Sequence, residues 1–320
     1  MEEIKDLDFP TSIPIDTISY CNLRCSMCPH KDMIRKKGIM KWDLFKKIID
    51  EIAEIDKNTR VYMVFFGEAL ILKKTKPSIF DMISYAKSVG LKNVVLNSNG
   101  VLLDKESSKK LIDAGLDAIY IGIDAFSEET YNKLRVGGDY NRVVQNVLDL
   151  IEVKKDKSAT INIEAQFIEM EENIKERNDF IKYWISQGVN VKIRKKLSWT
   201  GLIESKTVNN IDVKRHPCYW MLNTMAITDK GEVTACPADP DTRFIAGNIK
   251  DQSIKEVWNG KLKELRDIHR KGKWDRLIYP CNQCKDWKIS YKDELIQAKK
   301  RNIIKKMIKY FSKFHVLSGK

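Results

Sequence analysis

Short apolar runs alternate with amphipathic stretches from Ile13 to about Leu197. The runs are rich in β-branched residues and have the length of strands, whereas the apolar positions of the stretches recur at helical spacing. The predicted strands are Ile13–Ser19, Val61–Phe66, Asn93–Leu96, Ala118–Ile123, Thr160–Phe167 and Val189–Ile193. The predicted helices are Trp42–Ile55, Ser78–Val89, Lys105–Ala114, Tyr140–Val153 and Ile174–Gln187.

Six strand–helix units in succession predict an α/β fold with a parallel sheet wrapped by helices. They would form a partial (β/α)6 barrel, an open version of the eight-unit TIM barrel, with ligands bound at the C-terminal ends of its strands. Gly90, Gly115 and Gly188 are expected to end three of the helices.

The pattern changes after Ser198. Two short runs, Asn223–Thr228 and Glu232–Cys236, flank a turn sequence and predict a β-hairpin, and Ser253–His269 predicts one helix. We therefore expect a core over residues 1–200, a small domain over 201–290 and a C-terminal helix over 291–320. Ile304, Met307, Ile308, Phe311 and Phe314 form an apolar stripe on that basic helix. Such a helix either docks on the barrel or contacts an anionic membrane surface, and both alternatives stay open.

The net charge of +13 raises the question of nucleic acid binding. From Lys285 to Lys320 there are eleven Lys or Arg and three Asp or Glu, a net +8, which leaves 13 − 8 = +5 for the first 284 residues. The excess lies in the tail, and we expect no nucleic acid partner. Met1–Pro14 has no long apolar run, and the stretch Val61–Leu72 is interrupted by Glu68. These features predict a cytoplasmic protein.

Seven cysteines in a cytoplasmic chain favour metal ligation over disulfides. Cys21, Cys25 and Cys28 follow the first predicted strand with the spacing C-x3-C-x2-C. Three thiolates can hold three irons of a [4Fe–4S] cluster and leave the fourth iron open to a ligand. A zinc site completed by His30 is the alternative.

This cysteine loop is the signature of the radical S-adenosylmethionine (SAM) superfamily, which the chain resembles over nearly its whole length. The resemblance implies that SAM binds the open iron and is cleaved to a 5′-deoxyadenosyl radical. Gly67-Glu68 resembles the family's GGEP motif, whose acid holds the methionine ammonium, although Phe66 and Ala69 depart from it.

Further motifs match the family in order along the chain. Ser98-Asn99-Gly100 is similar to the Thr-Asn-Gly that approaches the ribose, and Gly122-Ile123-Asp124-Ala125 is similar to Ser-Leu-Asp-Gly without its hydroxyl. Arg135 matches an arginine that reaches the methionine carboxylate, and Met27 stands where the family places an apolar residue beside adenine. The cofactor-binding residues implied by the resemblance are Met27, Gly67, Glu68, Ser98, Asn99, Asp124 and Arg135.

The remaining cysteines, Cys218, Cys236, Cys281 and Cys284, could form a four-thiolate zinc site or a closed [4Fe–4S] cluster. This segment resembles the short auxiliary-cluster domain called twitch, a relative of the SPASM domain. The cysteine spacing is similar to that of 2-deoxy-scyllo-inosamine dehydrogenases from aminoglycoside biosynthesis, which favours a second [4Fe–4S] cluster.

Two clusters would use all seven cysteines, which argues against epimerases that need a cysteine as hydrogen donor. A closed cluster is suited to accept an electron, so we expect a two-electron oxidation of a sugar or cyclitol hydroxyl, with a flavodoxin or ferredoxin as external donor. Arg194 and Lys196 end the sixth strand on one face, and Arg194 is the candidate catalytic residue that would hold the hydroxyl.

Two other functions remain open. SPASM relatives also modify ribosomally made peptides, although only about twenty residues precede Cys21, too few for the usual leader-binding domain. A non-catalytic zinc scaffold is the third possibility.

Overall fold

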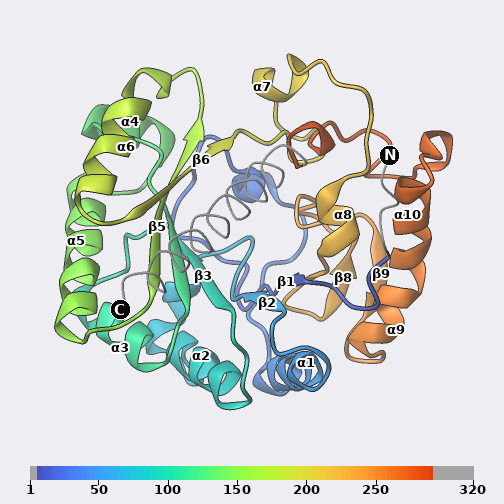
Figure 1. Ribbon diagram of the computed structural model, residues 1–320, viewed down its shortest axis with the longest axis horizontal. Coiled ribbons are helices and arrows are strands. Elements are labelled where there is room, and N and C mark those ends of the chain that lie inside the picture. Colours follow the sequence, from blue (N-terminus) through green and yellow to red (C-terminus); the bar gives the residue numbers. More distant parts are fainter. Residues whose placement is uncertain (1–5, 291–320) are drawn as a thin grey trace, which may run out of the picture.

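The computed structural model describes residues 6–290. The predicted terminal helix, with its membrane contact, lies outside the described residues. Figure 1 shows a parallel sheet wrapped by helices at one side and a smaller unit beside its first strand. Among the described residues, no helix combines the length and the apolar character that crossing a membrane requires.

The six-stranded sheet is parallel and its strands lie in sequence order, from β1 to β6. The strands are β1 (Ser12–Pro14), β2 (Arg60–Tyr62), β3 (Val94–Ser98), β4 (Ala118–Gly122), β5 (Asn162–Glu169) and β6 (Asn190–Lys195). This sequential order is what short right-handed strand–helix–strand connections produce. It confirms the prediction of a partial (β/α)6 barrel.

Helices cover the outer face of the sheet. They are α1 (Trp42–Ile55), α2 (Ile79–Ser88), α3 (Lys105–Asp113), α4 (Glu128–Leu134), α5 (Tyr140–Asp156) and α6 (Arg177–Ser186), with short 3-10 segments η1 (Pro29–Asp32), η2 (Ala69–Lys74) and η3 (Ile174–Glu176). Ser78 caps α2 in a reciprocal capping box with Asp81, and Asp139 caps α5 through the Arg142 amide. Gly90, Gly115 and Gly188 end three helices with positive φ, as predicted.

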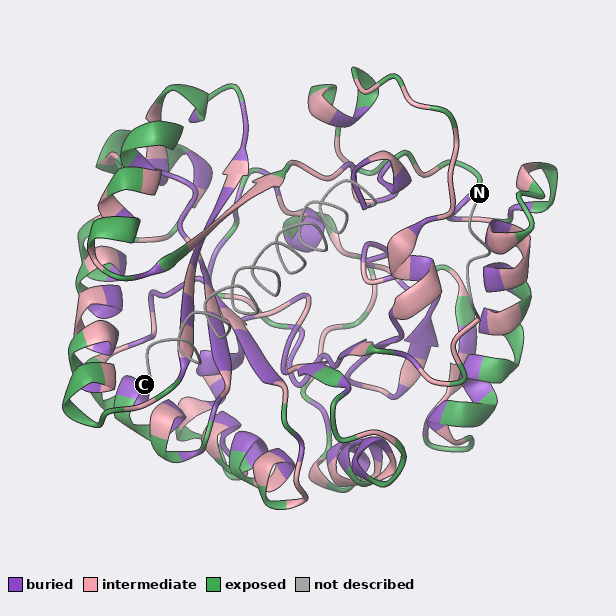
Figure 2. Ribbon diagram, viewed as in Figure 1, coloured by how far each residue is buried: buried purple, intermediate pink, exposed green. Residues whose placement is uncertain are grey.

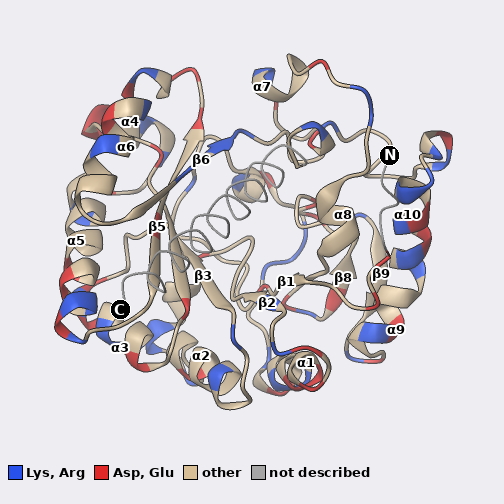
Figure 3. Cartoon of the chain, in the orientation of Figure 1, with Lys and Arg blue, Asp and Glu red and all other residues tan. Residues whose placement is uncertain are grey.

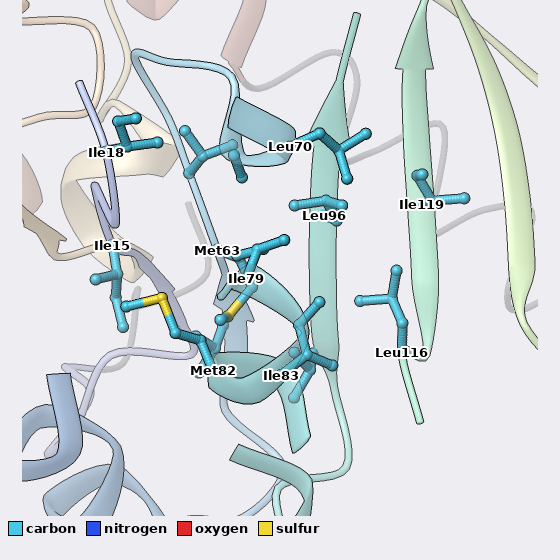
Figure 4. Close-up of a cluster of buried hydrophobic side chains, with 14 of the residues drawn as sticks. Ile15, Ile18, Met63, Leu70, Ile79, Met82, Ile83, Leu96, Leu116 and Ile119 are labelled. Atoms are coloured by element: carbon cyan, nitrogen blue, oxygen red, sulfur yellow. The ribbon is translucent and has the colours of Figure 1, made fainter. Parts of the chain in front are cut away.

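The apolar stripes of the helices meet the sheet in one continuous core. Figure 2 shows the buried residues along the inner sides of the helices and the strands, and Figure 4 shows Ile15, Met63 and Leu96 packed with α2 residues. This core extends beyond the barrel, because Ile227, Val233 and Trp258 belong to the same cluster.

The smaller unit contains a three-stranded antiparallel sheet of β7 (Ala226–Ile227), β8 (Glu232–Thr234) and β9 (Ile245–Asn248). The β7–β8 hairpin confirms the sequence prediction, whereas β9 was not predicted. Its helices are α7 (Lys206–Asn209), α8 (Tyr219–Asn223), α9 (Ile254–Asn259) and α10 (Lys261–Arg270), followed by η4 (Trp274–Arg276). The single helix predicted over Ser253–His269 is wrong, because the backbone turns at Gly260, with φ −90° and ψ −125°.

A buried ion cluster joins the smaller unit to the barrel. The Arg35 guanidinium pairs with Asp16 after β1, and with Asp229 Oδ1 of the β7–β8 turn at 2.9 Å. Its Nε also donates to the Pro240 carbonyl at 2.7 Å. Burial raises the pKa of Asp16 to about 6, and the nearby Arg35 cation opposes this shift. Isolated bridges, among them Ile15 to Ile227, run beside this cluster.

Candidate active site and cysteine sites

A cavity of about 210 Å³ opens at the C-terminal ends of the barrel strands. This is where a parallel barrel presents its ligand site. The predicted residues that line it are Cys21, Cys25, Met27, Cys28, Gly67, Glu68, Ser98, Asn99, Arg135 and Arg194. The fold therefore brings together every residue predicted for the first site except Asp124.

The first cysteine group lies in the loop that follows β1. The Arg24 amide donates to the Val136 carbonyl and the Ser26 amide to the Leu134 carbonyl, each at 2.9 Å, so the segment after α4 holds the loop. Burial raises the pKa of Cys21 to about 11 and of Cys28 to about 12, so both thiols are protonated at neutral pH until a metal displaces the proton. Three cysteines on one cavity wall fit an iron–sulfur cluster with one open iron.

Gly67 explains how the cysteine loop can lie against the end of β2. A Cβ atom at Gly67 would stand 2.2 Å from the Ile18 carbonyl oxygen, so only glycine permits this approach. The next amide, of Glu68, donates to the Tyr20 carbonyl at 2.9 Å. Gly67 therefore positions the loop that carries Cys21.

The Glu68 carboxylate is buried and accepts three hydrogen bonds. They come from the Leu70 amide at 3.1 Å, the Ser98 hydroxyl at 3.0 Å and the Asn99 amide at 2.7 Å. Burial nevertheless raises the pKa of Glu68. A carboxylate that is both buried and fixed would gain from a cationic ligand, which fits the ammonium group of SAM.

Arg135 and Asp124 form a buried pair beside the cysteine loop. The Arg135 guanidinium donates to Asp124 Oδ2 and, at 3.6 Å, to Cys25 Sγ, while Asp124 Oδ1 accepts from the Ile168 amide at 2.7 Å. Asp124 faces Arg135 and does not line the cavity. A Cβ at Gly122 would stand 2.2 Å from Arg135 Nη2, so the guanidinium fills the space where the family has a serine side chain.

Met27 and Trp199 lie together at the cavity wall. The Trp199 indole donates to the Met27 carbonyl at 2.9 Å and packs on the Phe66 ring at 5.4 Å between centroids. Met27 thus has its carbonyl engaged and contributes its apolar side chain to the lining.

Arg194 lines the cavity from the end of β6. Its Nη1 donates to Gln166 Oε1 on β5 at 3.1 Å, and Gln166 Nε2 donates to Glu164 at 2.8 Å. Gln166, Tyr120 and Asn97 also line the cavity and were missed by the sequence analysis. The sequence signal that could have identified them is a polar residue, flanked by apolar residues, near the C-terminal end of a strand.

The second cysteine group comes together in the smaller unit. Cys218 precedes α8, Cys236 follows β8, and Cys281 and Cys284 lie in the loop after η4. All four line one small cavity of about 20 Å³. Backbone amides of Ala238 and Asp286 donate to the sulfurs of Cys236 and Cys284, at 3.4 and 3.3 Å. Amide donors to sulfur are typical of iron–sulfur sites, so the donor set fits a closed cluster.

The described residues contain no group of three His, Cys, Asp or Glu side chains that could hold a single metal ion. The cysteines of a [4Fe–4S] cluster do not converge on one point, because each iron takes its own cysteine and the sulfurs surround the cluster.

Glu68→Gln is expected to weaken SAM binding about ten-fold or more while both clusters remain, because it removes the negative charge facing the ammonium. Equilibrium binding of SAM to the reconstituted variant measures this, with iron content as the check on the clusters. Glu152→Gln, at an exposed pair with Lys105, is the control. Unchanged affinity would mean that Glu68 does not contact the cofactor.

Comparison with known proteins gives the same picture. The family model of the radical SAM superfamily matches residues 15–181, and the SPASM iron–sulfur cluster-binding domain matches residues 218–285. Among solved structures, BtrN in complex with AdoMet and 2-DOIA superimposes with a TM-score of 0.60 at 17% identity, covering 88% of this chain and 94% of BtrN. Streptococcus suis SuiB bound to precursor peptide SuiA gives a TM-score of 0.66 at 14% identity, and the superposition covers 89% of this chain and 71% of SuiB. These likenesses show the fold.

Curated relatives are similar over part of the chain. A tungsten-containing aldehyde ferredoxin oxidoreductase cofactor-modifying protein of Pyrococcus furiosus is 27% identical over 183 residues, 56% of this chain and 49% of that protein. A GTP 3′,8-cyclase of Limosilactobacillus fermentum is 27% identical over 186 residues, which is 56% of this chain and 52% of that protein. The chain thus spans about half the length of these relatives.

The radical SAM match covers 167 of the 320 residues, just over half of the chain. This family uses SAM with a [4Fe–4S] cluster, and the SPASM domain adds auxiliary iron–sulfur binding. The chain therefore belongs to the radical SAM superfamily, with a small C-terminal SPASM domain.

Proposed function

We propose that this radical SAM enzyme is a dehydrogenase that oxidises a hydroxyl-bearing carbon of a sugar or cyclitol to a carbonyl. In this proposal the second cysteine group holds a [4Fe–4S] cluster that accepts an electron, and a flavodoxin or ferredoxin supplies the reducing electron for SAM. The observation that carries the proposal is a short connection between the two cysteine sites.

That connection is the turn from Ser198 to Thr200. Trp199 lines the first cavity and Thr200 lines the second. The buried Asp286 carboxylate accepts from the Ser198 amide at 2.7 Å and from the Thr200 amide at 3.1 Å. The Asp286 amide donates to Cys284 Sγ at 3.3 Å. A path of one turn and two hydrogen bonds therefore leads from the substrate cavity to a ligand of the second site.

Backbone strain in this turn supports a functional role. Trp199 and Thr200 both adopt left-handed conformations, with φ of 50° and 59°. Such conformations cost about 1–3 kcal/mol each and persist where surrounding contacts hold them. Asp286 supplies those contacts, because its carboxylate holds the amides on both sides of Trp199.

The cavity also offers groups for a polar substrate. Besides Arg194, the side chains of Gln166, Asn97 and Tyr120 line it. When bound, SAM and the clusters would supply hydrogen-atom abstraction from carbon and take up the second electron, while the hydroxyl proton leaves to water. The chain's own residues hold and orient the substrate, with Arg194 as its main contact.

Product analysis tests this function. With the correct substrate, each turnover is expected to consume one SAM and yield one 5′-deoxyadenosine and one ketone, and deuterium at the oxidised carbon should appear in the 5′-deoxyadenosine. The dehydrogenase proposal would be contradicted if the product kept the oxidation state of the substrate, or if SAM were regenerated after each turnover. A peptide product with a new crosslink would move the substrate to the peptide-modifying alternative.

A further inference from the structure

Cationic side chains outnumber carboxylates in the lining of the first cavity. Its lining includes four cationic side chains, Arg135, Arg194, Lys195 and Lys196, and one carboxylate, Glu68. Figure 3 shows Lys and Arg gathered where β6 ends. An excess of cations at a ligand site points to a ligand that brings negative charge.

Two of the four cations have carboxylate partners of their own. Arg135 pairs with the buried Asp124. Lys195 pairs with Glu169, which also accepts from Arg177 Nε at 3.1 Å. Each of these two cations therefore has a carboxylate partner within the protein.

Arg194 and Lys196 are different. Within the described residues, the Arg194 guanidinium donates a hydrogen bond to the neutral amide oxygen of Gln166. This bond orients the arginine side chain but does not compensate its positive charge. For Lys196, the described residues provide no carboxylate within ion-pair distance. The two residues are separated by one position at the end of β6 and both reach the cavity lining.

We propose that the substrate carries a phosphate monoester, and that Arg194 and Lys196 bind it. Two uncompensated cations match a group with a charge of about −1.5 to −2 at neutral pH. The planar guanidinium can take two phosphate oxygens and the ammonium a third. The substrate class is then a phosphorylated sugar or cyclitol.

This assignment rests on the proposed function and names the substrate class for the same cavity. It also changes the role of Arg194. Arg194 holds a phosphate oxygen in place of the reacting hydroxyl. The reacting carbon is then turned toward the part of the cavity lined by the cysteine loop and Glu68. A cationic aminocyclitol would meet two like charges and bind poorly.

Binding measurements test the proposal without turnover. The probes are inorganic phosphate, glucose 6-phosphate, glucose and glucosamine, titrated calorimetrically into the anaerobic, reconstituted full chain with SAM bound. We expect saturable binding of the two phosphate-bearing probes at one site per chain, and at least ten-fold weaker binding of glucose and glucosamine. Arg194→Gln and Lys196→Gln should each weaken phosphate binding about ten-fold or more, since each removes a charge-assisted contact.

Lys110→Gln is the control, because its ammonium forms an exposed pair with Glu106 on α3 and does not line the cavity, so phosphate binding should not change. SAM affinity should stay the same in the Arg194 and Lys196 variants. The proposal is overturned if phosphate shows no saturable binding, if glucose binds as well as glucose 6-phosphate, or if the two variants lose SAM affinity, which would assign the cations to the cofactor. Failure of the dehydrogenase reaction would appear in product analysis alone.

Discussion

Replacing Cys21, Cys25 and Cys28 together with Ala is expected to remove about half of the iron from the reconstituted protein and to abolish SAM cleavage. Two four-iron clusters correspond to about eight irons per chain, so about four should remain. The reason is geometric: these three sulfurs lie in one loop on the wall of the first cavity, and the other four cysteines line a separate cavity. Iron and sulfide analysis after anaerobic reconstitution, with 5′-deoxyadenosine formation under dithionite, provides the readout.

The matched control is the double variant Cys281→Ala and Cys284→Ala. It should also lose about half of the iron, yet it should still cleave SAM, because the first cysteine group is intact. Bound zinc together with only four irons in the unmodified protein would contradict the auxiliary cluster. Zinc without iron would favour the scaffold alternative.

Arg35→Ala is expected to destabilise the whole chain by about 3–5 kcal/mol, because it leaves Asp16 and Asp229 buried without a cation. Urea denaturation of the full chain under anaerobic conditions measures the loss in the free energy of unfolding. Lys36→Ala, at an exposed position next to Arg35, is the control and should have little effect. A loss below about 1 kcal/mol would show that the cluster does not join barrel and small domain.

The same variant should show a distinct pH dependence. Without Arg35, burial is opposed only by the hydrogen bonds from the Phe65 and Phe66 amides, so the pKa of Asp16 in the folded state rises further above the unfolded value. A carboxyl group whose pKa is higher in the folded than in the unfolded state stabilises the folded chain fully below the unfolded-state pKa. This stabilisation is lost as the pH rises through the folded-state pKa. The stability difference between Arg35→Ala and the unmodified chain should therefore be smaller at pH 5 than at pH 8.

Local patterns predicted most of the barrel. The helix over Trp42–Ile55 was predicted with the bounds that the structure has, because its apolar stripe is long and regular. Short elements were missed. Strand β9 has few residues and no alternation, and α4 was missed although Ser127 caps it through the Thr130 amide. The break at Gly260 was also missed, since periodicity continues on both sides of it.

The motifs around the first cavity were recognisable from sequence because they lie in segments that follow the strands, and the parallel sheet brings the ends of its strands to one edge. By itself the sequence therefore determined the fold class and the family and indicated most of the residues around the first cavity, although Asn97, Tyr120 and Gln166 were missed. Only the tertiary structure decided which charges are compensated. Arg135 meets Asp124, Lys195 meets Glu169, and Arg194 meets the neutral Gln166. Such pairings join side chains from different strands and loops, so they depend on how the sheet closes and leave no local pattern in the chain.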